Sequence, residues 1–371
     1  MSTRALITGG AGFIGSHLAD ELLRCGYQVR VLDALVPQVH EGERGRPAYL
    51  ARAAELVVGD VRDPRVVRRA LEDVDVVFHL ASAVGVGQSM WRVTEYLDTN
   101  TMGASVLLEA LIARPVARLI VASSMSVYGE GLYRDDDDQL YEDVARSPER
   151  LAGGDWDPRD ARGRPLAPLP TPETKRPSLA SVYALSKYDQ ERLGLMIGAT
   201  YGIPTTALRF FNVYGPRQAL SNPYTGVLAI FAARLLHHRP PLIFEDGRQR
   251  RDFVHVRDVA RACRLALDAP ASVGGVFNIG SGDAITILEV AHRLARVLER
   301  DVEPELIGQY RVGDIRHCTA DLSQAAAVLG YRPEVAFDDG LAELGDWLGS
   351  QVAHDRIEGM CQELAARGLA R

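Results

Sequence analysis

The sequence has few cysteines and no long apolar run, and both absences limit its class. Its 371 residues include four cysteines, which are widely scattered and form no C-x-x-C pair: Cys25, Cys263, Cys318 and Cys361. This pattern is typical of reduced, mostly buried side chains and not of disulfides or metal ligands. No apolar run reaches the length of about 18 residues that a membrane span needs. Because a strand begins by residue 4 and leaves no room for a signal peptide, we expect a cytoplasmic protein that does not enter a membrane.

An excess of positive charge is also absent. The formal net charge is -7 at pH 7, which argues against nucleic acid as the main partner. A small phosphorylated substrate stays possible, because a few local arginines can override the sign of the whole chain. The composition, 47% hydrophobic and 25% charged, is ordinary for a globular protein. The length suffices for two core-bearing units or for one large α/β domain with an appendage.

A glycine-rich turn stands between the first predicted strand and the first predicted helix. Residues 4–8 form a short apolar run, residues 16–24 show helical spacing, and Gly9, Gly12 and Gly15 lie between them. Glycine allows a tight turn and a close approach of the backbone, and the N-terminus of the helix offers unpaired N–H groups. The turn therefore predicts a site for the pyrophosphate of a dinucleotide.

An acidic residue follows at the end of the second predicted strand. Residues 28–33 form this strand, and Asp33 ends it at the position where a carboxylate accepts hydrogen bonds from the adenosine ribose hydroxyls. Ala34 and Leu35 come next, so no Arg or Lys is placed to bind a ribose phosphate. The pattern favours NAD over NADP as the cofactor.

Strands and helices alternate through the first 130 residues. This rhythm predicts an α/β fold with a Rossmann-type, doubly wound and mostly parallel sheet. Asp33, Asp60, Ser82 and Ser124 end successive strands, and an open parallel sheet binds its ligands at that edge. The expected strands are 28–33, 55–60, 74–81 and 118–124, and the expected helices are 64–71 and a single long helix over 96–112.

Residues from about 130 to 178 break the rhythm with many prolines and poor hydrophobic periodicity. We interpret them as an irregular surface insertion that could be ordered in part as a lid or a binding surface. Asp135 to Asp138 form a run of four carboxylates, which favours a solvated loop over a cation site.

Regular spacing returns at Ser181 and continues to residue 350. The expected elements are helices at 183–201, 226–238, 287–300, 323–329 and 340–350, strands at 204–211 and 276–280, and a further strand and helix within 252–267. We expect a NAD-binding domain at 1–211 with 252–270. A smaller α/β substrate-binding domain is expected at 212–251 with 271–371.

Tyr183 and Lys187 lie at positions i and i+4 of a predicted helix and share one face. A neighbouring ammonium stabilises a phenolate, so it is expected to lower the pKa of Tyr183 toward neutrality and make it a general base. The pair gains weight from its order in the chain, because it follows the glycine turn, Asp33 and the hydroxyls of Ser123 and Ser124.

Taken together, these motifs resemble those of the extended short-chain dehydrogenases/reductases, in the group of NAD-dependent nucleotide-sugar epimerases and dehydratases. The matching stretches are 8–15, 59–61, 79–81, 123–129, 183–187, 209–217, 251–258 and 278–282. The resemblance implies Ser124, Tyr183 and Lys187 as catalytic residues. The cofactor-binding residues that it implies are Gly9, Gly12, Phe13, Ile14, Gly15, Asp33, Asp60, Val61, Leu80, Ala81, Ser82, Asn100, Tyr183 and Lys187.

The same resemblance implies a nucleotide-diphosphate sugar as the substrate. Arg251 and Arg311 would clamp the diphosphate, which suits the fixed donors of guanidinium groups, and Phe244 would stack on the nucleobase. The substrate-binding residues that it implies are Ser124, Ser126, Asn212, Val227, Phe244, Arg251 and Arg311. No metal is expected, because residues 130–180 lack the cysteine pairs found in the insertion of some relatives.

The implied reaction is a transient oxidation. Tyr183 removes the proton of a sugar hydroxyl, and the carbon that bears this hydroxyl gives a hydride to NAD. When the hydride returns to the other face of the 4-keto sugar, the configuration at C4 is inverted. Met125 and Ser126 stand where related 4,6-dehydratases carry an acidic pair, and Val84 replaces a lysine of UDP-galactose 4-epimerases. Residues 215–227 and the insertion resemble enzymes of the dTDP-L-rhamnose 4-epimerase type. A dTDP-6-deoxyhexose is therefore favoured over a UDP-hexose.

Two other functions stay open. A reductase, dehydrogenase or decarboxylase of the same family would show net redox change or release of CO2. A catalytically silent NAD-sensing protein would typically lose the Tyr/Lys pair, which this chain keeps. The resemblance also implies a homodimer, formed through the helices at 96–112 and 183–201.

Overall fold

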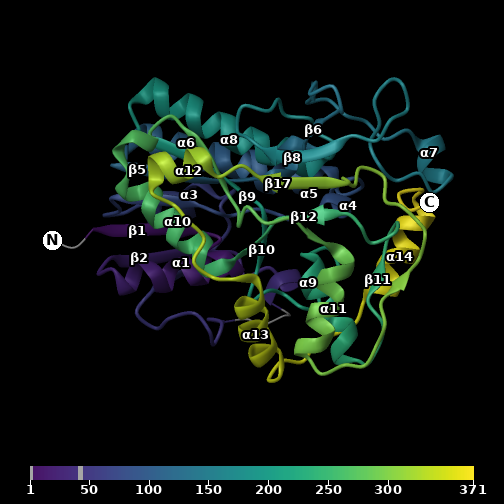
Figure 1. Cartoon of the computed structure of the whole chain (residues 1–371). Coiled ribbons are helices and arrows are strands. Elements are labelled where there is room, and N and C mark those ends of the chain that lie inside the picture. Colours follow the sequence, from purple (N-terminus) through teal and green to yellow (C-terminus); the bar gives the residue numbers. More distant parts are fainter. Residues whose placement is uncertain (1–2, 41–44) are drawn as a thin grey trace.

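The computed structural model describes residues 3–40 and 45–371, and a seven-stranded sheet forms its centre (Figure 1). The strand order is β14-β9-β5-β4-β1-β2-β3, and every neighbouring pair is parallel. The strands are β1 (Arg4–Thr8), β2 (Gln28–Asp33), β3 (Glu55–Val58), β4 (Val76–His79), β5 (Arg118–Ser124), β9 (Thr205–Phe210) and β14 (Val276–Ile279). Successive residues such as Leu6 and Ile7 point to opposite faces and are both fully buried, as a sheet covered on both sides requires. The predicted Rossmann-type fold is confirmed.

Helices cover the sheet on its two faces. On one face lie α1 (Phe13–Arg24), α10 (Val256–Asp268) and α12 (Ser323–Leu329), and on the other α3 (Pro64–Ala70), α6 (Gly103–Ala113) and α8 (Val182–Tyr201). Leu18, Leu22 and Val259 pack with Ile7 in the first core, whereas Leu107 packs with Leu6 in the second. Packing in these two cores holds the helices in place on the faces of the central sheet.

The expected single helix at 96–112 has three parts. A short helix α5 (Val93–Tyr96) leads into a π-helical turn η1 (Leu97–Met102), which continues as α6. Asn100, in the π-turn, is fully buried and its side chain is bonded outside the helix to Ala83 and Ser186. The hydrophobic spacing predicted the helix but not the extra residue in this turn.

A third core lies beneath the sheet in Figure 1 and is built from later segments, which we call the second unit. It contains helices α9 (Val227–Leu236), α11 (Ile287–Val297) and α13 (Phe337–Leu348), next to the parallel pair β10 (Asn212–Tyr214) and β13 (Phe253–His255). Strand β14, which we had assigned to the second domain at 271–371, is the edge strand of the central sheet. Its four residues VFNI are largely buried and pair with β9, so the chain returns to the first unit there.

The insertion is more ordered than expected. It contains β6 (Leu132–Arg134), β7 (Leu140–Tyr141), α7 (Pro148–Ala152) and β8 (Ala167–Thr171), and these strands join β12 (Arg250–Arg251), β15 (Ile285–Thr286) and β17 (His317–Ala320) in a six-stranded sheet. In the four-Asp run, residues 136–138 are exposed, but Asp135 is buried and accepts from the amides of Asp137 and Gln139 at 2.9 Å. The insertion is therefore bound to the second unit and is not a free loop.

The C-terminal segment forms a helix that the sequence did not predict. Helix α14 (Ile357–Ala366) packs through Ile357, Met360 and Leu364 against Phe244, and the residues after it pair with the segment that contains Arg311. The remaining short elements are α2 (Pro37–His40), α4 (Val86–Ser89), η2 (Met125–Tyr128), β11 (Leu242–Ile243), η3 (Pro270–Ser272) and β16 (Glu305–Leu306). Within residues 3–40 and 45–371, no helix is long and apolar enough to span a membrane.

Candidate active site

One cavity of about 880 Å³ runs from the carboxyl ends of the central strands to the core of the second unit. All the residues that we predicted for the cofactor, the chemistry and the substrate line this cavity, with the single exception of Asn100. The sequence therefore identified one continuous site, although the roles of its members stay predictions.

The glycine turn leaves room and donors for a pyrophosphate. Gly9 has a φ of 69°, and a Cβ atom there would lie 2.8 Å from the backbone nitrogen of Ala81. A Cβ at Gly15 would lie 2.4 Å from the carbonyl oxygen of Gly9. Helix α1 begins after Gly12 with no side-chain cap and no acidic residue in its first turn. Its free N–H groups and positive dipole suit a bound anion, so the turn fits a dinucleotide.

Two carboxylates are held in place at the same edge of the sheet. Asp33 accepts from the amides of Ala11 at 3.0 Å and of Leu35 at 2.9 Å, which fixes it at the end of β2. Asp60 forms a hydrogen-bonded ion pair of 2.6 Å with Arg62, and this contact holds the pKa of Asp60 below its ordinary value. Both face the cavity. Asp33 ends β2 at the cavity as expected, and its contact with the ribose stays a prediction.

Asn100 does not reach the cavity. Its side-chain oxygen accepts from the amide of Ala83 at 2.7 Å, and its nitrogen donates to the carbonyl of Ala83 and to the hydroxyl of Ser186. These three bonds use both N–H donors and one lone pair of the oxygen, and the side chain is fully buried. We therefore reassign Asn100 from cofactor contact to support of the loop after β4, whose residues do line the cavity.

The predicted catalytic residues come from two elements that converge. Ser124 ends β5, and Tyr183 and Lys187 lie in the first turns of α8, which Ser181 caps by accepting from the amide of Ala184 at 3.1 Å. The hydroxyl of Ser124 also donates to Ser126 at 3.2 Å. The end of the strand and the start of the helix thus bring both hydroxyl residues and the amine to one end of the cavity.

The pKa of Tyr183 differs from our expectation. Burial raises the pKa of Tyr183, and a hydrogen bond with Ser124 only partly offsets this effect. Burial lowers the pKa of Lys187 to about 7, opposed by the nearby carboxylate of Glu191. The ammonium of Lys187 donates to Gln190 at 2.5 Å. The loss of hydration on burial outweighs the hydrogen bond with Ser124, so the phenol is protonated at neutral pH.

Gln190 is a site residue that we missed. Besides accepting from Lys187, it donates to the carbonyls of Ala81 at 3.2 Å and Asn100 at 3.1 Å, and lies 3.1 Å from Nε2 of His79. It therefore ties the lysine to the end of β4. The signal was available, because Gln190 follows Lys187 by three positions and shares its helix face.

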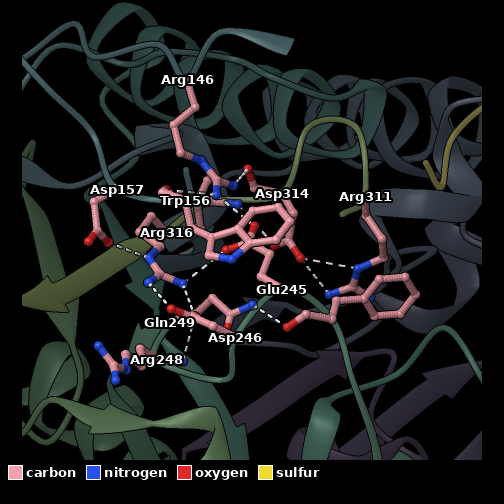
Figure 2. Close-up of polar contacts among 12 residues, drawn as sticks. Arg146, Trp156, Asp157, Glu245, Asp246, Arg248, Gln249, Arg311, Asp314 and Arg316 are labelled. Atoms are coloured by element: carbon pink, nitrogen blue, oxygen red, sulfur yellow. Dashed lines mark hydrogen bonds and ion pairs between the residues drawn. The ribbon is translucent and has the colours of Figure 1, made fainter. Parts of the chain in front are cut away.

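The predicted diphosphate ligands Arg251 and Arg311 also line the cavity, and Figure 2 shows Arg311 directed toward Asp314. Arg251 and Arg311 both bind the carboxylate of Asp314, at 3.2 and 2.7 Å. Burial alone would raise the pKa of Asp314, but the two guanidinium groups hold it well below its usual range. The guanidinium of Arg311 lies 4.9 Å from the ring centre of Phe244. Asp314 thus holds the two cations together beside an aromatic face, an arrangement that suits a nucleoside diphosphate.

Three further predicted ligands also line the cavity. Asn212, at the start of β10, has a buried side-chain oxygen with no hydrogen-bond partner within the described residues, so a donor from a ligand would satisfy it. Val227 begins α9, and Ser126 lies in the turn after β5. All three face the cavity. Within the described chain, no cluster of His, Cys, Asp or Glu is arranged to hold a metal ion.

A model of the NAD dependent epimerase/dehydratase family matches residues 5–148 and 164–280. The chain belongs to this family. The unmatched gap falls inside the insertion, and the matched part holds every predicted site residue except Arg311. NAD is therefore the cofactor, as the glycine turn and Asp33 predicted.

Curated relatives span almost the whole chain. A dTDP-L-rhamnose 4-epimerase of Burkholderia thailandensis is 34% identical over 353 residues, covering 94% of this chain and 96% of that enzyme. A UDP-N-acetyl-alpha-D-glucosaminuronate decarboxylase of Bacillus cytotoxicus is 32% identical over 354 residues, covering 94% and 98%. The family thus places the chain among nucleotide-sugar enzymes of more than one reaction type.

Solved structures agree in fold. A UDP-glucose 4-epimerase of Thermotoga maritima with UDP-glucose superposes with a TM-score of 0.77 at 32% identity, covering 94% of this chain and 99% of that one. A UDP-glucose 4-epimerase of Thermus thermophilus in complex with NAD gives a TM-score of 0.75 at 30% identity, covering 94% and 100%. The first of these structures holds UDP-glucose and the second holds NAD.

Proposed function

We propose that this chain is an NAD-dependent epimerase that inverts C4 of a nucleotide-diphosphate sugar through a transient 4-keto sugar. The observation that carries the proposal is one continuous cavity, lined by Ser124, Tyr183 and Lys187 from β5 and α8 and by Arg251 of β12 together with Arg311. A diphosphate bound by the arginines would direct its sugar toward the hydroxyl residues.

The roles of the side chains follow from their placement. NAD, when bound, supplies a centre that takes a hydride from the sugar and gives it back. Tyr183 must first lose its own proton to solvent, and the positive charges of Lys187 and of the oxidised nicotinamide ring would stabilise the phenolate that remains. This phenolate takes the proton of the C4 hydroxyl as the sugar is oxidised and returns it as the sugar is reduced. Ser124 donates a hydrogen bond to the oxygen of the C4 hydroxyl. Lys187, held by Gln190, supplies positive charge beside Tyr183 when Tyr183 is a phenolate.

The turn after β5 supports epimerisation over dehydration. Residues 123–129 carry no carboxyl group, and Met125 and Ser126 line the cavity where an acid and a base would be needed to eliminate water. Glu130, the next carboxylate along the chain, is bound to Arg146 at 3.0 Å and to the amide of Arg316 at 2.8 Å. It is therefore occupied away from the sugar.

A dTDP-6-deoxyhexose is the favoured substrate. Beside Phe244 the cavity is walled by Ile357, Met360 and Leu364 of α14, and this apolar surface suits the methyl group of thymine. Val84 also lines the cavity and offers no charge to a sugar. The similarity to the rhamnose epimerase of Burkholderia thailandensis points to the same sugar class.

A reductase, dehydrogenase or decarboxylase of the same family is the alternative, which the Bacillus cytotoxicus relative supports. A silent NAD-sensing protein is disfavoured because Tyr183 and Lys187 are both kept at the cavity. We also propose a homodimer through η1, α6 and α8, where Met102, Leu185 and Met196 expose 54%, 41% and 56% of their surface. The cytoplasmic location stays a prediction.

The test is incubation of the purified protein with dTDP-, UDP- and GDP-sugars, with products identified by NMR. A C4 epimer without net NADH supports the proposal, and stoichiometric NADH or CO2 would contradict it in favour of a dehydrogenase or decarboxylase. Tyr183→Phe should abolish turnover, because it removes the hydroxyl that carries the proton in this mechanism, while NAD binding measured by fluorescence stays largely unchanged.

A further inference from the structure

Arg146 belongs to the insertion, but its side chain is only 5% exposed and contacts the second unit (Figure 2). Its Nε atom lies 3.0 Å from Glu130, and its two terminal nitrogens donate to the carboxylate of Glu245 at 2.6 Å and to the backbone carbonyl of Asp314 at 2.8 Å. One guanidinium thus connects three segments of the chain.

Two of these segments carry the predicted nucleotide ligands. Glu245 directly follows Phe244, and Asp314 is the residue that binds both Arg251 and Arg311. Arg146 itself does not line the cavity. It therefore contacts the supports of the aromatic ring and of the two cations without being able to touch a ligand there.

The backbone at Glu245 is held in an uncommon conformation. Its φ is 57°, in the left-handed region that non-glycine residues rarely adopt, and the residue is 2% exposed. Its carboxylate is shared between Arg146 and Arg316, the latter at 3.0 Å. Such a conformation persists only where the surroundings enforce it, and here two buried arginines do so. The contact with the insertion therefore affects how the Phe244 loop is shaped.

We propose that Arg146 is a positioning residue for the nucleoside diphosphate part of the substrate, acting through Glu245 and Asp314 to fix Phe244, Arg251 and Arg311 before the ligand binds. This inference rests on one part of the proposed function, the binding of a nucleotide-diphosphate sugar, and does not depend on which reaction follows. It gives the insertion a role in the affinity for the nucleotide. The chemistry at Ser124 and Tyr183 receives no contact from Arg146 and proceeds at an unchanged rate once substrate is bound.

The variant Arg146→Met tests this role, because it should fold. Glu245 keeps its ion pair with Arg316, and Glu130 still accepts from the amide of Arg316 at 2.8 Å. Binding of UDP and dTDP to the NAD-loaded protein is measured by calorimetry. We expect Kd to rise about tenfold, because a pre-organising contact is lost. KM should rise in proportion, with kcat within about twofold. Arg146→Lys should recover part of the affinity.

Arg159→Met is the matched control. Arg159 also lies in the insertion, but its side chain binds Asp155 and the carbonyl of Gly163, which both belong to the insertion, so nucleotide affinity should not change. A folded Arg146→Met protein with wild-type Kd, or with a fall in kcat alone, overturns the proposal even if its melting temperature falls. If the wild-type protein itself binds neither UDP nor dTDP, the nucleotide-sugar site of the proposed function fails as well.

Discussion

Removing the ammonium of Lys187 should change how the stability of the cofactor-free protein depends on pH. Lys187 is 3% exposed, and its hydrogen-bond acceptor, Gln190, is neutral. Burial lowers its pKa from the ordinary 10.5 to about 7, despite the opposing field of Glu191. At about 1.4 kcal/mol per pH unit, this difference of about 3.5 corresponds to a cost of about 5 kcal/mol when the folded protein must carry the charge.

The sign of the effect follows from proton counting. Between pH 7 and 10.5 the unfolded chain holds a proton on Lys187 that the folded chain has released. The free energy of unfolding of the wild type therefore rises with pH through this window, by up to about 1.4 kcal/mol per pH unit from this group. Lys187→Met lacks this contribution. The variant should be more stable than the wild type below pH 7, and the difference should close toward pH 10.5.

Urea unfolding between about pH 6 and pH 10 measures this difference, since the midpoint and slope give the free energy at each pH. Tyr183→Phe is the matched control, because burial raises the pKa of Tyr183 above its ordinary 10 and keeps the phenol protonated across the same range. Parallel curves for wild type and Lys187→Met would refute the reasoning, because they would mean that folding does not shift the pKa of Lys187.

Two further predictions concern the glycine turn and the surface of α8. Gly15→Ala would put a Cβ atom 2.4 Å from the carbonyl oxygen of Gly9, and the backbone of the turn cannot easily move to relieve this clash. We expect Gly15→Ala to lower the free energy of unfolding by about 1–3 kcal/mol and to abolish NAD binding as measured by fluorescence. Gly359→Ala is the control, because Gly359 has open space around it, and it should change neither stability nor NAD binding. Light scattering at micromolar protein should show a dimer, and Met196→Glu should give a monomer. A monomeric wild type would contradict the proposed interface.

The parts of the site that depend on local sequence could be predicted. A strand, a glycine turn and a helix are adjacent in the chain, so Gly9, Gly15 and Asp33 needed no knowledge of distant residues. The parallel order of the strands then placed Ser124 at the same edge. Tyr183 and Lys187 followed from helical spacing alone.

The parts of the fold and the site that depend on contacts between distant segments could not be predicted. Strand β14 is a short apolar run, and such a run does not indicate that β9 is the strand with which it pairs. The strands of the insertion are two to five residues long, and Arg146 meets Glu245 across 99 positions of sequence. The pKa of Tyr183 is set by burial from every wall of the cavity, so its direction was wrongly expected from one neighbouring charge.

The π-helical turn η1 has a consequence for how this enzyme can vary. It holds Asn100 against Ala83 and Thr101 against Asp189, while Leu107 and Leu111 after it pack in the core. An α-helix turns by about 100° per residue. Deleting any one residue between 97 and 102 would rotate the two sets of contacts against each other by that angle. The segment can therefore change its residue types more readily than its length, and a one-codon deletion here should be more damaging than most substitutions.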